Sequence, residues 1–520
     1  AKGPAIDLGT GRAPIEYRPL RAIDGHGREL IVEGTNRSDT IRKLVLRLDD
    51  SRSRDYASRV NVEREIPPGP FRLRMPVEGL TTPSKRVIDA GDIRLVILTP
   101  WPENDAIVIS RFDLAPIGGL PRGGAGFALG ADDAPLPTGF ERISPGDPRL
   151  VGRTLQARRR PMPDPLVANG IRGIEALTLA STPGRKRVTI WSEDPGEWEF
   201  LPAVLDRTIR VNGRTLERTR QTFDQWISRR YLVRRWDEHG PESDSWEAFG
   251  RFRGNRRSIE VDAPDGRIRI TVAGDTRDAR YISGVLIEPA SATTALDQVI
   301  AERAAWYRSN LPTVRPTADG RPTVPTAHAG HEIEIRWDAG TEAATAAAPV
   351  RLRLAPDTGT RLTLTITSHD RIERPAIILE APTGPAGRKL GLDAWAAQWR
   401  FDRTEPQNTH LEWRDDRLVA DLDRLPIDPA RPRRYELWLR ATATTRPGAY
   451  TGAVTLSDPA RPGRSLSIPI EAEVLDVTLP PAAKPAGPYL AYAPHLTWHT
   501  GRKFRDRQAV CDLETLAAFG

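Results

Sequence analysis

The stretch RPGAYTGAVTL (446–456) is followed by SLSIPIEAEVLDVTL (465–479), and together they predict two strands that close a β-sandwich. Arg446, Pro447 and Gly448 form a turn signal, after which small or polar residues alternate with apolar ones. Successive side chains of a strand point to opposite faces, so this alternation indicates one buried and one exposed face.

The pattern changes after this hairpin. Four prolines between positions 480 and 488 cannot continue a β-ladder. The apolar run Tyr489–Leu496 then predicts a strand, and Asp506–Phe519 predicts a helix. We expect residues 481–520 to form a short C-terminal strand-helix unit that opens another domain.

Length and composition favour several β-rich domains. A chain of 520 residues is too long for one core, and 47 Pro and 42 Gly are typical of many short strands joined by tight turns. We predict a mainly β protein built of tandem β-sandwiches. The 76 basic residues include only seven lysines, so arginine dominates, and the 69 acidic residues are interleaved with it. Since no basic run alternates with aromatics, we expect no nucleic-acid partner.

Three further features limit the class of protein. The single cysteine, Cys511, excludes an intramolecular disulfide and a thiolate metal cluster. No run of about 18 apolar residues predicts a membrane span. The opening AKGPAIDLG has no leader pattern, which fits either a cytoplasmic protein or a secreted one whose signal peptide has been removed.

Residues 1–118 predict a first sandwich. Its expected strands are 28–34, 42–50, 71–77, 93–100 and 106–114. Their order, with Asn36 after the first, resembles the galactose-binding-like jelly-roll modules that precede bacterial polysaccharidases. Those modules often hold a structural calcium through an Asp in the last strand. Ser110 and Arg111 stand there instead, so we doubt a calcium site and expect no cofactor.

Residues 125–311 predict a second sandwich. The opening FALGADD (127–133), the strand RKRVTIW (185–191), the VNG turn (211–213) and the Asp265-Gly266 hairpin occur in an order similar to malectin-like carbohydrate-binding modules. A helix should close the module, with Thr294 as its cap and Asp297 three residues on. The apolar face of this helix contains Leu296, Val299, Ile300, Trp306 and Tyr307.

Residues 312–480 predict a third sandwich. Its expected strands before the closing pair are 331–338, 350–356, 361–368, 375–382, 417–427 and 434–444. Gly448 to Gly452 and the exit Val474 to Pro480 resemble the immunoglobulin-like domain that precedes a (β/α)8 barrel in several glycoside-hydrolase-like proteins. This resemblance implies that residues 481–520 begin such a barrel. His495, Trp498 and His499 would then follow its first strand and become candidate substrate-binding residues.

Catalytic residues are not identified by the sequence. A glycoside hydrolase usually needs two carboxylates that flank the scissile bond. The pairs Glu193-Asp194 and Asp415-Asp416 lie in turn-like settings and are expected to be solvated loops. No nucleophile elbow or phosphate-binding Gly loop is present. His495 and His499 are four residues apart, but Pro494 and Gly501 argue against a helix, so no metal site is expected.

Aromatic residues give the candidate sugar contacts, because an indole can stack on the apolar face of a sugar ring. Trp236 and Trp246 lie in the polar stretch RRWDEHGPESDSW (234–246), where exposure and burial are equally open. Trp191, inside an alternating strand, is expected to be buried. Trp395, Trp399 and Trp413 are expected to be cap or core residues.

The leading hypothesis is a secreted or periplasmic carbohydrate-active protein. In it, the sandwiches form the glycan-binding and scaffolding part of a glycoside hydrolase that acts on a polysaccharide, and this chain alone is inactive. The alternative is a non-catalytic extracellular glycan-binding or cell-surface interaction protein. A third possibility is an assembly scaffold without sugar contacts, because sandwiches serve many roles.

Overall fold

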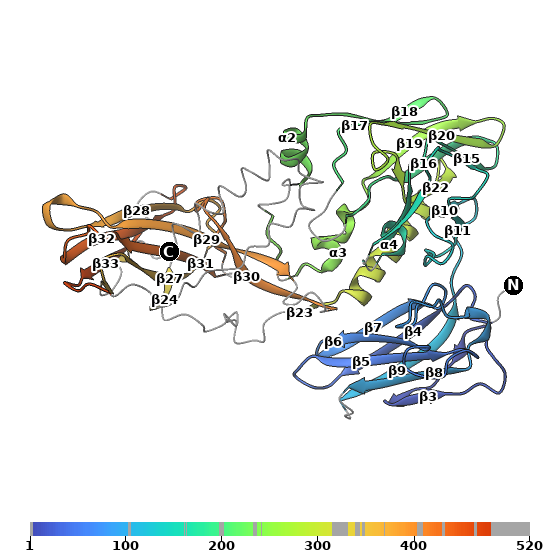
Figure 1. The fold of residues 1–520 in the computed structure, drawn as a ribbon, viewed down its shortest axis with the longest axis horizontal. Coiled ribbons are helices and arrows are strands. Elements are labelled where there is room, and N and C mark those ends of the chain that lie inside the picture. Colours follow the sequence, from blue (N-terminus) through green and yellow to red (C-terminus); the bar gives the residue numbers. More distant parts are fainter. Residues whose placement is uncertain are drawn as a thin grey trace. The chain divides into compact units, whose positions relative to one another are not determined.

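The structure is a computed structural model that describes residues 4–101, 106–160, 162, 164–196, 202–231, 237–240, 242–314, 331–337, 344–345, 349–368, 370–402, 409–428, 432–461 and 465–479. With 51% of the described residues in strands and 11% in helices, the prediction of a mainly β fold with tandem sandwiches is confirmed (Figure 1). The chain divides into two compact units. Unit 1 contains residues 1–235, 241–315 and 401–412, and unit 2 contains 236–240, 316–400 and 413–520. The strand and helix expected within 481–520 lie outside the described residues.

The first sandwich consists of two antiparallel sheets, blue in Figure 1. One sheet contains β1 (Ile6–Asp7), β9 (Ile107–Pro116), β4 (Arg28–Asn36) and β7 (Gly69–Pro76), with β2 (Gly11–Arg12) also paired to β9. The other contains β3 (Ile15–Tyr17), β8 (Leu95–Trp101), β5 (Arg42–Asp49) and β6 (Val60–Ile66), and the 3-10 helix η1 (Ala90–Asp92) precedes β8. Leu44, Leu46 and Leu48 of β5 all face the core, as alternation predicts.

The second sandwich is built from two five-stranded sheets and a small third sheet. The first sheet contains β11 (Phe140–Ile143), β10 (Ala125–Leu129), β22 (Gly284–Pro289), β16 (Gly184–Trp191) and β19 (Arg256–Ala263). The second contains β12 (Leu150–Val151), β15 (Ala176–Ala180), β20 (Arg267–Gly274), β17 (Asp206–Val211) and β18 (Arg214–Arg220). The small sheet contains β13 (Gln156–Arg159), β14 (Asn169–Arg172) and β21 (Tyr281–Ile282). Asn212 and Gly213 both have positive φ, which is the geometry a tight hairpin turn requires between β17 and β18.

Helix α4 (Thr294–Asn310) packs against the sheet that contains β16. Val299 contacts the same apolar cluster as Trp191, while Trp306 and Tyr307 are also buried. The expected cap is wrong by one residue, because the helix begins at Thr294 and the preceding Thr293, at the N-cap, makes no side-chain cap bond. The short helices of this module are α1 (Pro165–Ala168), α2 (Phe223–Trp226), the π-helix η2 (Ile227–Tyr231), α3 (Ser245–Ala248) and η3 (Gly250–Phe252).

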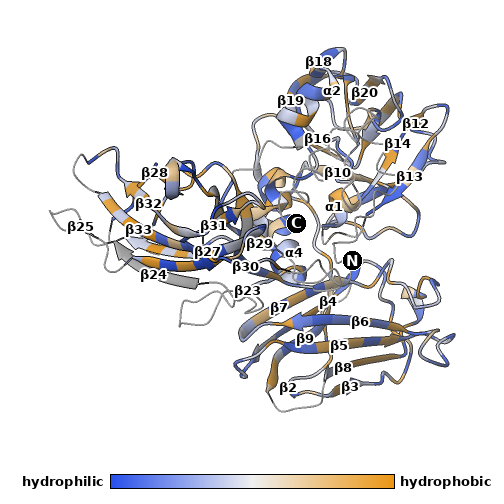
Figure 2. Cartoon of the chain, turned by 60° about the vertical axis from the view of Figure 1, so that its left-hand side comes forward, coloured by the Kyte–Doolittle hydropathy of each residue, from blue (hydrophilic) through white to orange (hydrophobic). Residues whose placement is uncertain are grey.

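The third sandwich also has two sheets. One contains β23 (Thr313–Val314), β30 (Leu411–Val419), β29 (Gly391–Asp402), β31 (Arg433–Ala441), β27 (Thr358–Ser368) and β24 (His331–Trp337). The other contains β25 (Ala344–Thr345), β33 (Ser465–Val474), β32 (Gly448–Ser457) and β28 (Ala376–Thr383), with β26 (Val350–Leu354) also on β33 and η4 (Pro385–Gly387) after β28. Figure 2 shows the alternation along β27 and β33 as bands of opposite hydropathy.

The closing hairpin forms as expected. β32 and β33 pair antiparallel along their whole length, from Gly448 opposite Val474 to Ser457 opposite Ser465. Tyr450 is buried, and its hydroxyl donates to the carbonyl of Arg446 at 2.9 Å. A tyrosine hydroxyl bonded to a backbone carbonyl a few residues upstream also occurs in immunoglobulin-like sandwiches, where it is called the tyrosine corner. The strand expected over 417–427 is misplaced. The strand in this region is β30, which begins at Leu411 and ends at Val419, because the chain turns immediately afterwards.

A four-residue segment from the middle of the sequence, 237–240, folds as part of unit 2. The His239 N–H donates to the carbonyl of Trp399 at 3.0 Å, and the Trp413 indole donates to the carbonyl of His239 at 2.9 Å. Trp399 and Trp413 are both buried and stack at 4.1 Å, so they are core residues, as expected. The segment 237–240 therefore contributes to the packing of the third sandwich.

Candidate functional site

The structure describes one of the five candidate sugar-contacting residues. Trp236, His495, Trp498 and His499 lie outside the described residues. Trp246 lies on α3 and is 7% exposed. Its ring lies 5.7 Å from that of Tyr307, and the Arg303 guanidinium lies 5.3 Å from its centre. The sequence left exposure and burial of Trp246 equally open, and the structure shows that Trp246 is buried. Its ring packs against Tyr307 and Arg303.

Arg303 and Asp164 form a buried ion pair beside this indole. Arg303 Nε donates to Asp164 Oδ2 at 2.7 Å, and both side chains are at most 4% exposed. Asp164 also caps α1 by accepting from the N–H of Leu166 at 3.0 Å. Such a pair is held by its geometry and its further hydrogen bonds, because two charges removed from water must be satisfied together. This pair fixes α4 against the segment that leads into α1.

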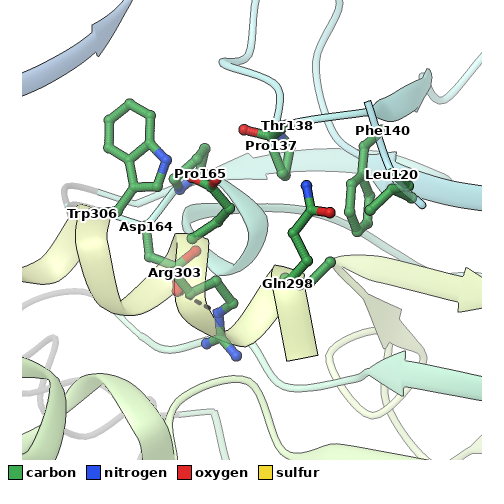
Figure 3. A pocket seen from close by; sticks show the side chains of 11 residues that line it. Leu120, Pro137, Thr138, Phe140, Asp164, Pro165, Gln298, Arg303 and Trp306 are labelled. Carbon is green, nitrogen blue, oxygen red and sulfur yellow. Dashed lines mark hydrogen bonds and ion pairs between the residues drawn. The ribbon is translucent and has the colours of Figure 1, made fainter. Parts of the chain in front are cut away.

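A cleft opens next to this ion pair (Figure 3). Its lining is mostly apolar and includes Leu120, Phe140 and Trp306. Its space is about 300 Å³ with the solvent at its mouth, and only about one water-sized group fits inside. Its carboxylates are already engaged, Asp164 by Arg303 and Glu302 by Arg74. Because only about one water-sized group fits inside, the cleft is too narrow for a sugar ring.

The outer face of the sheet β3-β8-β5-β6 carries an exposed indole that the sequence analysis did not single out. Trp101, at the end of β8, is 63% exposed. The period of two along β8 could have identified it, because Val96 and Leu98 face the core and Trp101 falls in the opposite phase. Lys43 of β5 stands directly opposite Trp101, and Glu65 of β6 stands opposite Lys43. Paired residues project from the same face, so an aromatic surface lies beside hydrogen-bonding groups.

The polar side chains of this outer face are ordered by ion pairs. Lys43 Nζ lies 2.8 Å from Glu63 Oε2, and this hydrogen bond raises the pKa of Lys43. Further along β5, Arg47 Nε donates to Asp49 Oδ1 at 2.8 Å. Glu65 accepts from Thr409 N at 2.9 Å and lies 2.6 Å from His410 Nδ1. The face thus combines one flat apolar ring with preformed donors and acceptors.

The acidic pairs that were expected in solvated loops are partly buried, so that expectation is wrong. Asp194 is 3% exposed and receives two hydrogen bonds from Arg160, at 2.8 and 2.7 Å. Asp415 lies on β30, and Arg434 Nε donates to its Oδ2 at 2.9 Å. Burial raises the pKa of Asp415, and Arg434 only partly opposes this. A partner distant in sequence allows each carboxylate to be buried, which local sequence cannot reveal.

Metal ligands are not gathered in the part of the chain that the structure describes. There, no three His, Cys, Asp or Glu side chains form a set that could hold a metal ion. Arg111 of β9 lies 2.6 Å from Asp113 and 3.4 Å from Glu33, so both carboxylates near the doubted calcium position contact a guanidinium. Among the described residues, no helix is long and apolar enough to cross a bilayer.

Comparisons with known proteins found no matching family and no matching curated protein. Solved structures with β-rich carbohydrate-active folds overlap parts of the chain. A Bacteroides uniformis beta-glucuronidase is 10% identical over 54% of this chain and 28% of its own, with a TM-score of 0.23. A family 123 glycoside hydrolase from Clostridium perfringens is 15% identical over 25% of this chain and 24% of its own, with a TM-score of 0.21. The CBM22 tandem domain of Paenibacillus barcinonensis Xyn10C is 7% identical over 56% of this chain and 99% of its own, with a TM-score of 0.16. The matches thus span less than a third of each hydrolase chain, and scores this low do not establish a common fold.

Proposed function

We propose that this chain is the glycan-binding and scaffolding part of a carbohydrate-active protein that acts on a polysaccharide. The observation that carries the proposal is Trp101, an indole 63% exposed on a sheet face opposite Lys43, whose ammonium contacts Glu63. Indoles stack on the apolar faces of sugar rings, while charged neighbours bond the hydroxyl groups. A flat sheet face suits an extended glycan better than the narrow cleft at α4 does.

The assignment of each module is part of this proposal. We infer a galactose-binding-like sandwich at 1–118, a malectin-like one at 125–311, an immunoglobulin-like one at 312–480 and the start of a (β/α)8 barrel at 481–520. The corner formed by Tyr450 supports the immunoglobulin-like assignment. The barrel, its sugar-lining residues His495, Trp498 and His499, and a secreted or periplasmic location rest on the sequence resemblance.

A non-catalytic glycan-binding protein is the second candidate. It is favoured by the state of the two carboxylates in the cleft, since Asp164 and Glu302 are both held by arginines. A carboxylate whose oxygens are held by a guanidinium is poorly placed to act as a general acid, because those oxygens already have a partner. The two candidates share the glycan face at Trp101 and differ in whether the protein cleaves the bound chain.

The test is binding of the full chain to a glycan array, followed by affinity measurements on the best ligand. We expect Trp101→Ala to weaken binding about 5- to 30-fold, the equivalent of roughly 1 to 2 kcal/mol, with an unchanged melting temperature. Tyr56→Ala is the matched control, because Tyr56 is also exposed on this sandwich, in the β5–β6 connection. Binding to no glycan, or equal binding by Trp101→Ala, would refute the proposal. A reducing-sugar assay on the bound polysaccharide separates the hydrolase from the non-catalytic candidate.

A further inference from the structure

The small sheet β13-β14-β21 presents an unusual face. Across this sheet, Arg158 stands opposite Gly170, and Arg172 stands opposite both Gln156 and Tyr281. Gly170 and Arg172 are two residues apart on β14, so all five residues project from the same face. The hydrogen bond from Arg172 Nε to Gln156 Oε1, 3.0 Å, agrees with this register.

Tyr281 reaches across this face toward Arg158. A Cβ atom added to Gly170 would lie 2.1 Å from both Cζ and the hydroxyl oxygen of Tyr281, so the end of the ring lies directly over Gly170. Gly170 is the strand partner of Arg158. The tyrosine is 0% exposed, and its hydroxyl has no hydrogen-bond partner among the residues that the structure describes. Buried hydroxyls are nearly always bonded to protein or water, so this hydroxyl is free to donate a hydrogen bond to a further group.

Among the charged side chains around this hydroxyl, one arginine has no carboxylate partner in the described part of the chain. Asp194 is bound by Arg160, Asp278 lies 3.0 Å from Arg172, and Glu193 is bound by Arg230. Arg158 is half-buried, forms no ion pair with a described residue, and its Nε is buried without a partner. Burial lowers the pKa of Arg158, and the neighbouring charges of Arg172 and Arg160 lower it further, while Asp278 and Asp194 oppose this only in part. The site thus has an excess of positive charge that water alone compensates poorly.

We propose that Arg158 and Tyr281 form a binding site for a small oxyanion. The guanidinium of Arg158 would supply the charge, and the Tyr281 hydroxyl would donate a hydrogen bond to one oxygen of the ligand. An oxyanion matches both groups, because a guanidinium presents several N–H donors to two oxygens and a phenol adds another. Gly170 gives the hydroxyl its room beside Arg158. The site is separate from the glycan face at Trp101, so either proposal can fail alone.

Two sources could supply this oxyanion: the carboxylate of an acidic sugar, or free inorganic phosphate. Calorimetric titration of the full chain at constant ionic strength with glucuronate, acetate, phosphate and glucose distinguishes them. Tighter binding of glucuronate than of acetate or phosphate identifies an acidic sugar. Preference for phosphate identifies a free-anion site. The absence of binding by all three anions overturns the proposal, as does equal binding of the neutral glucose.

Two variants test the residues. We expect Arg158→Gln and Tyr281→Phe each to weaken anion binding by roughly tenfold or more, since each removes a hydrogen bond to a charged group. Arg159→Gln is the matched control, because Arg159 is the next residue of β13, faces the other side and contacts Asp133 at 3.5 Å. Loss of anion binding in Arg159→Gln to the same extent would indicate a general charge effect and would overturn the site.

The ligand-free protein gives an independent readout. If the Tyr281 hydroxyl lacks a partner without ligand, Tyr281→Phe should leave the thermal midpoint unchanged or raise it, although it weakens binding. A hydroxyl with a purely structural role would lower that midpoint on removal. A lowered midpoint together with wild-type anion affinity therefore refutes the proposal. Should Arg158→Gln fail to fold, Arg158→Lys keeps the charge and should bind the anion more weakly than wild type.

Discussion

Arg433 and Glu238 form a bidentate ion pair inside the third sandwich, with both N–O distances at 2.7 Å, although 195 residues separate them in the sequence. The Arg433 side chain is 0% and that of Glu238 8% exposed. Arg433 also donates to the carbonyls of Ala397 and Pro426. These bonds satisfy a guanidinium that would otherwise be costly to bury. The pair therefore makes the segment 237–240 part of the third sandwich.

Loss of Glu238 should strongly destabilise this sandwich. We expect Glu238→Ala to lower the free energy of unfolding by roughly 3 to 5 kcal/mol, because Arg433 would remain buried and unpaired. Chemical denaturation followed by tryptophan fluorescence measures this change, since Trp399 and Trp413 lie beside the segment. Glu471→Ala is the control: Glu471 pairs with Arg351, whose side chain is 81% exposed, so its loss should cost less than about 1 kcal/mol. Equal losses in both variants would contradict the role of the buried pair.

Replacement of Trp246 by alanine should lower the free energy of unfolding strongly, whereas replacement of Trp101 should hardly change it. Trp246→Ala should lower the free energy of unfolding by roughly 3 to 5 kcal/mol, because it leaves a cavity beside Tyr307 and removes a ring contact with Arg303. Trp101→Ala should change it by no more than about 0.5 kcal/mol, because its indole is exposed. Thermal unfolding of both variants checks this. A stable Trp246→Ala protein would show that this indole is not a core residue.

Acid should weaken the first sandwich through Asp50. Burial opposes ionisation of Asp50, but hydrogen bonds from Arg86, the N–H of Asp89 and Ser53 outweigh it and lower the pKa to about 2. A lowered folded-state pKa gives stability that is present above the unfolded pKa of 3.8 and is lost as pH falls toward 2. Asp50→Asn should therefore remove on the order of 2 kcal/mol at neutral pH and flatten the pH dependence between 4 and 2. Unfolding curves over pH 2–7 test this, with Asp39→Asn, a substitution at an exposed residue of the same sandwich, as control. A slope that persists in Asp50→Asn would assign it to other groups.

Glu288 should lower the stability of the folded protein as pH rises, which is the opposite of the effect of Asp50. Glu288 is 1% exposed and lies 3.9 Å from Arg187, and within the described part of the chain neither carboxylate oxygen has a hydrogen-bond partner of standard geometry. Burial raises its pKa, and the N–H groups of Leu296 and Ala295 only partly oppose this. A raised pKa makes the folded state bind protons more tightly, so stability falls as pH rises above the unfolded value of 4.5. Glu288→Gln should remove this decline, so the variant should be at least as stable as wild type at neutral pH. Unfolding curves of both proteins over pH 4–7 test this, and an unaltered decline in Glu288→Gln would exclude Glu288 as its source.

Local sequence determined the closing hairpin and the long helix, because strand alternation, helical spacing and turn chemistry depend on neighbours in the chain, whereas it misplaced the strand expected over 417–427. The pairing of β32 with β33 follows from the alternation after Gly448, and the tight turn at Asn212 and Gly213 follows from the positive φ those residues accept. The apolar face of α4 was also predictable, since Val299, Trp306 and Tyr307 recur at helical spacing. Its first residue was not, because Thr293 and Thr294 both precede the apolar pattern.

Only the tertiary structure decided which polar and aromatic side chains are covered. Trp246 stands in a polar stretch of the sequence, yet the fold brings Tyr307 and Arg303 of α4 against its ring and buries it. Asp194 and Asp415 resemble loop residues until Arg160 and Arg434 are brought beside them. Exposure and ion pairing depend on partners far along the chain, and a charged group can be buried only where the fold supplies its counter-charge.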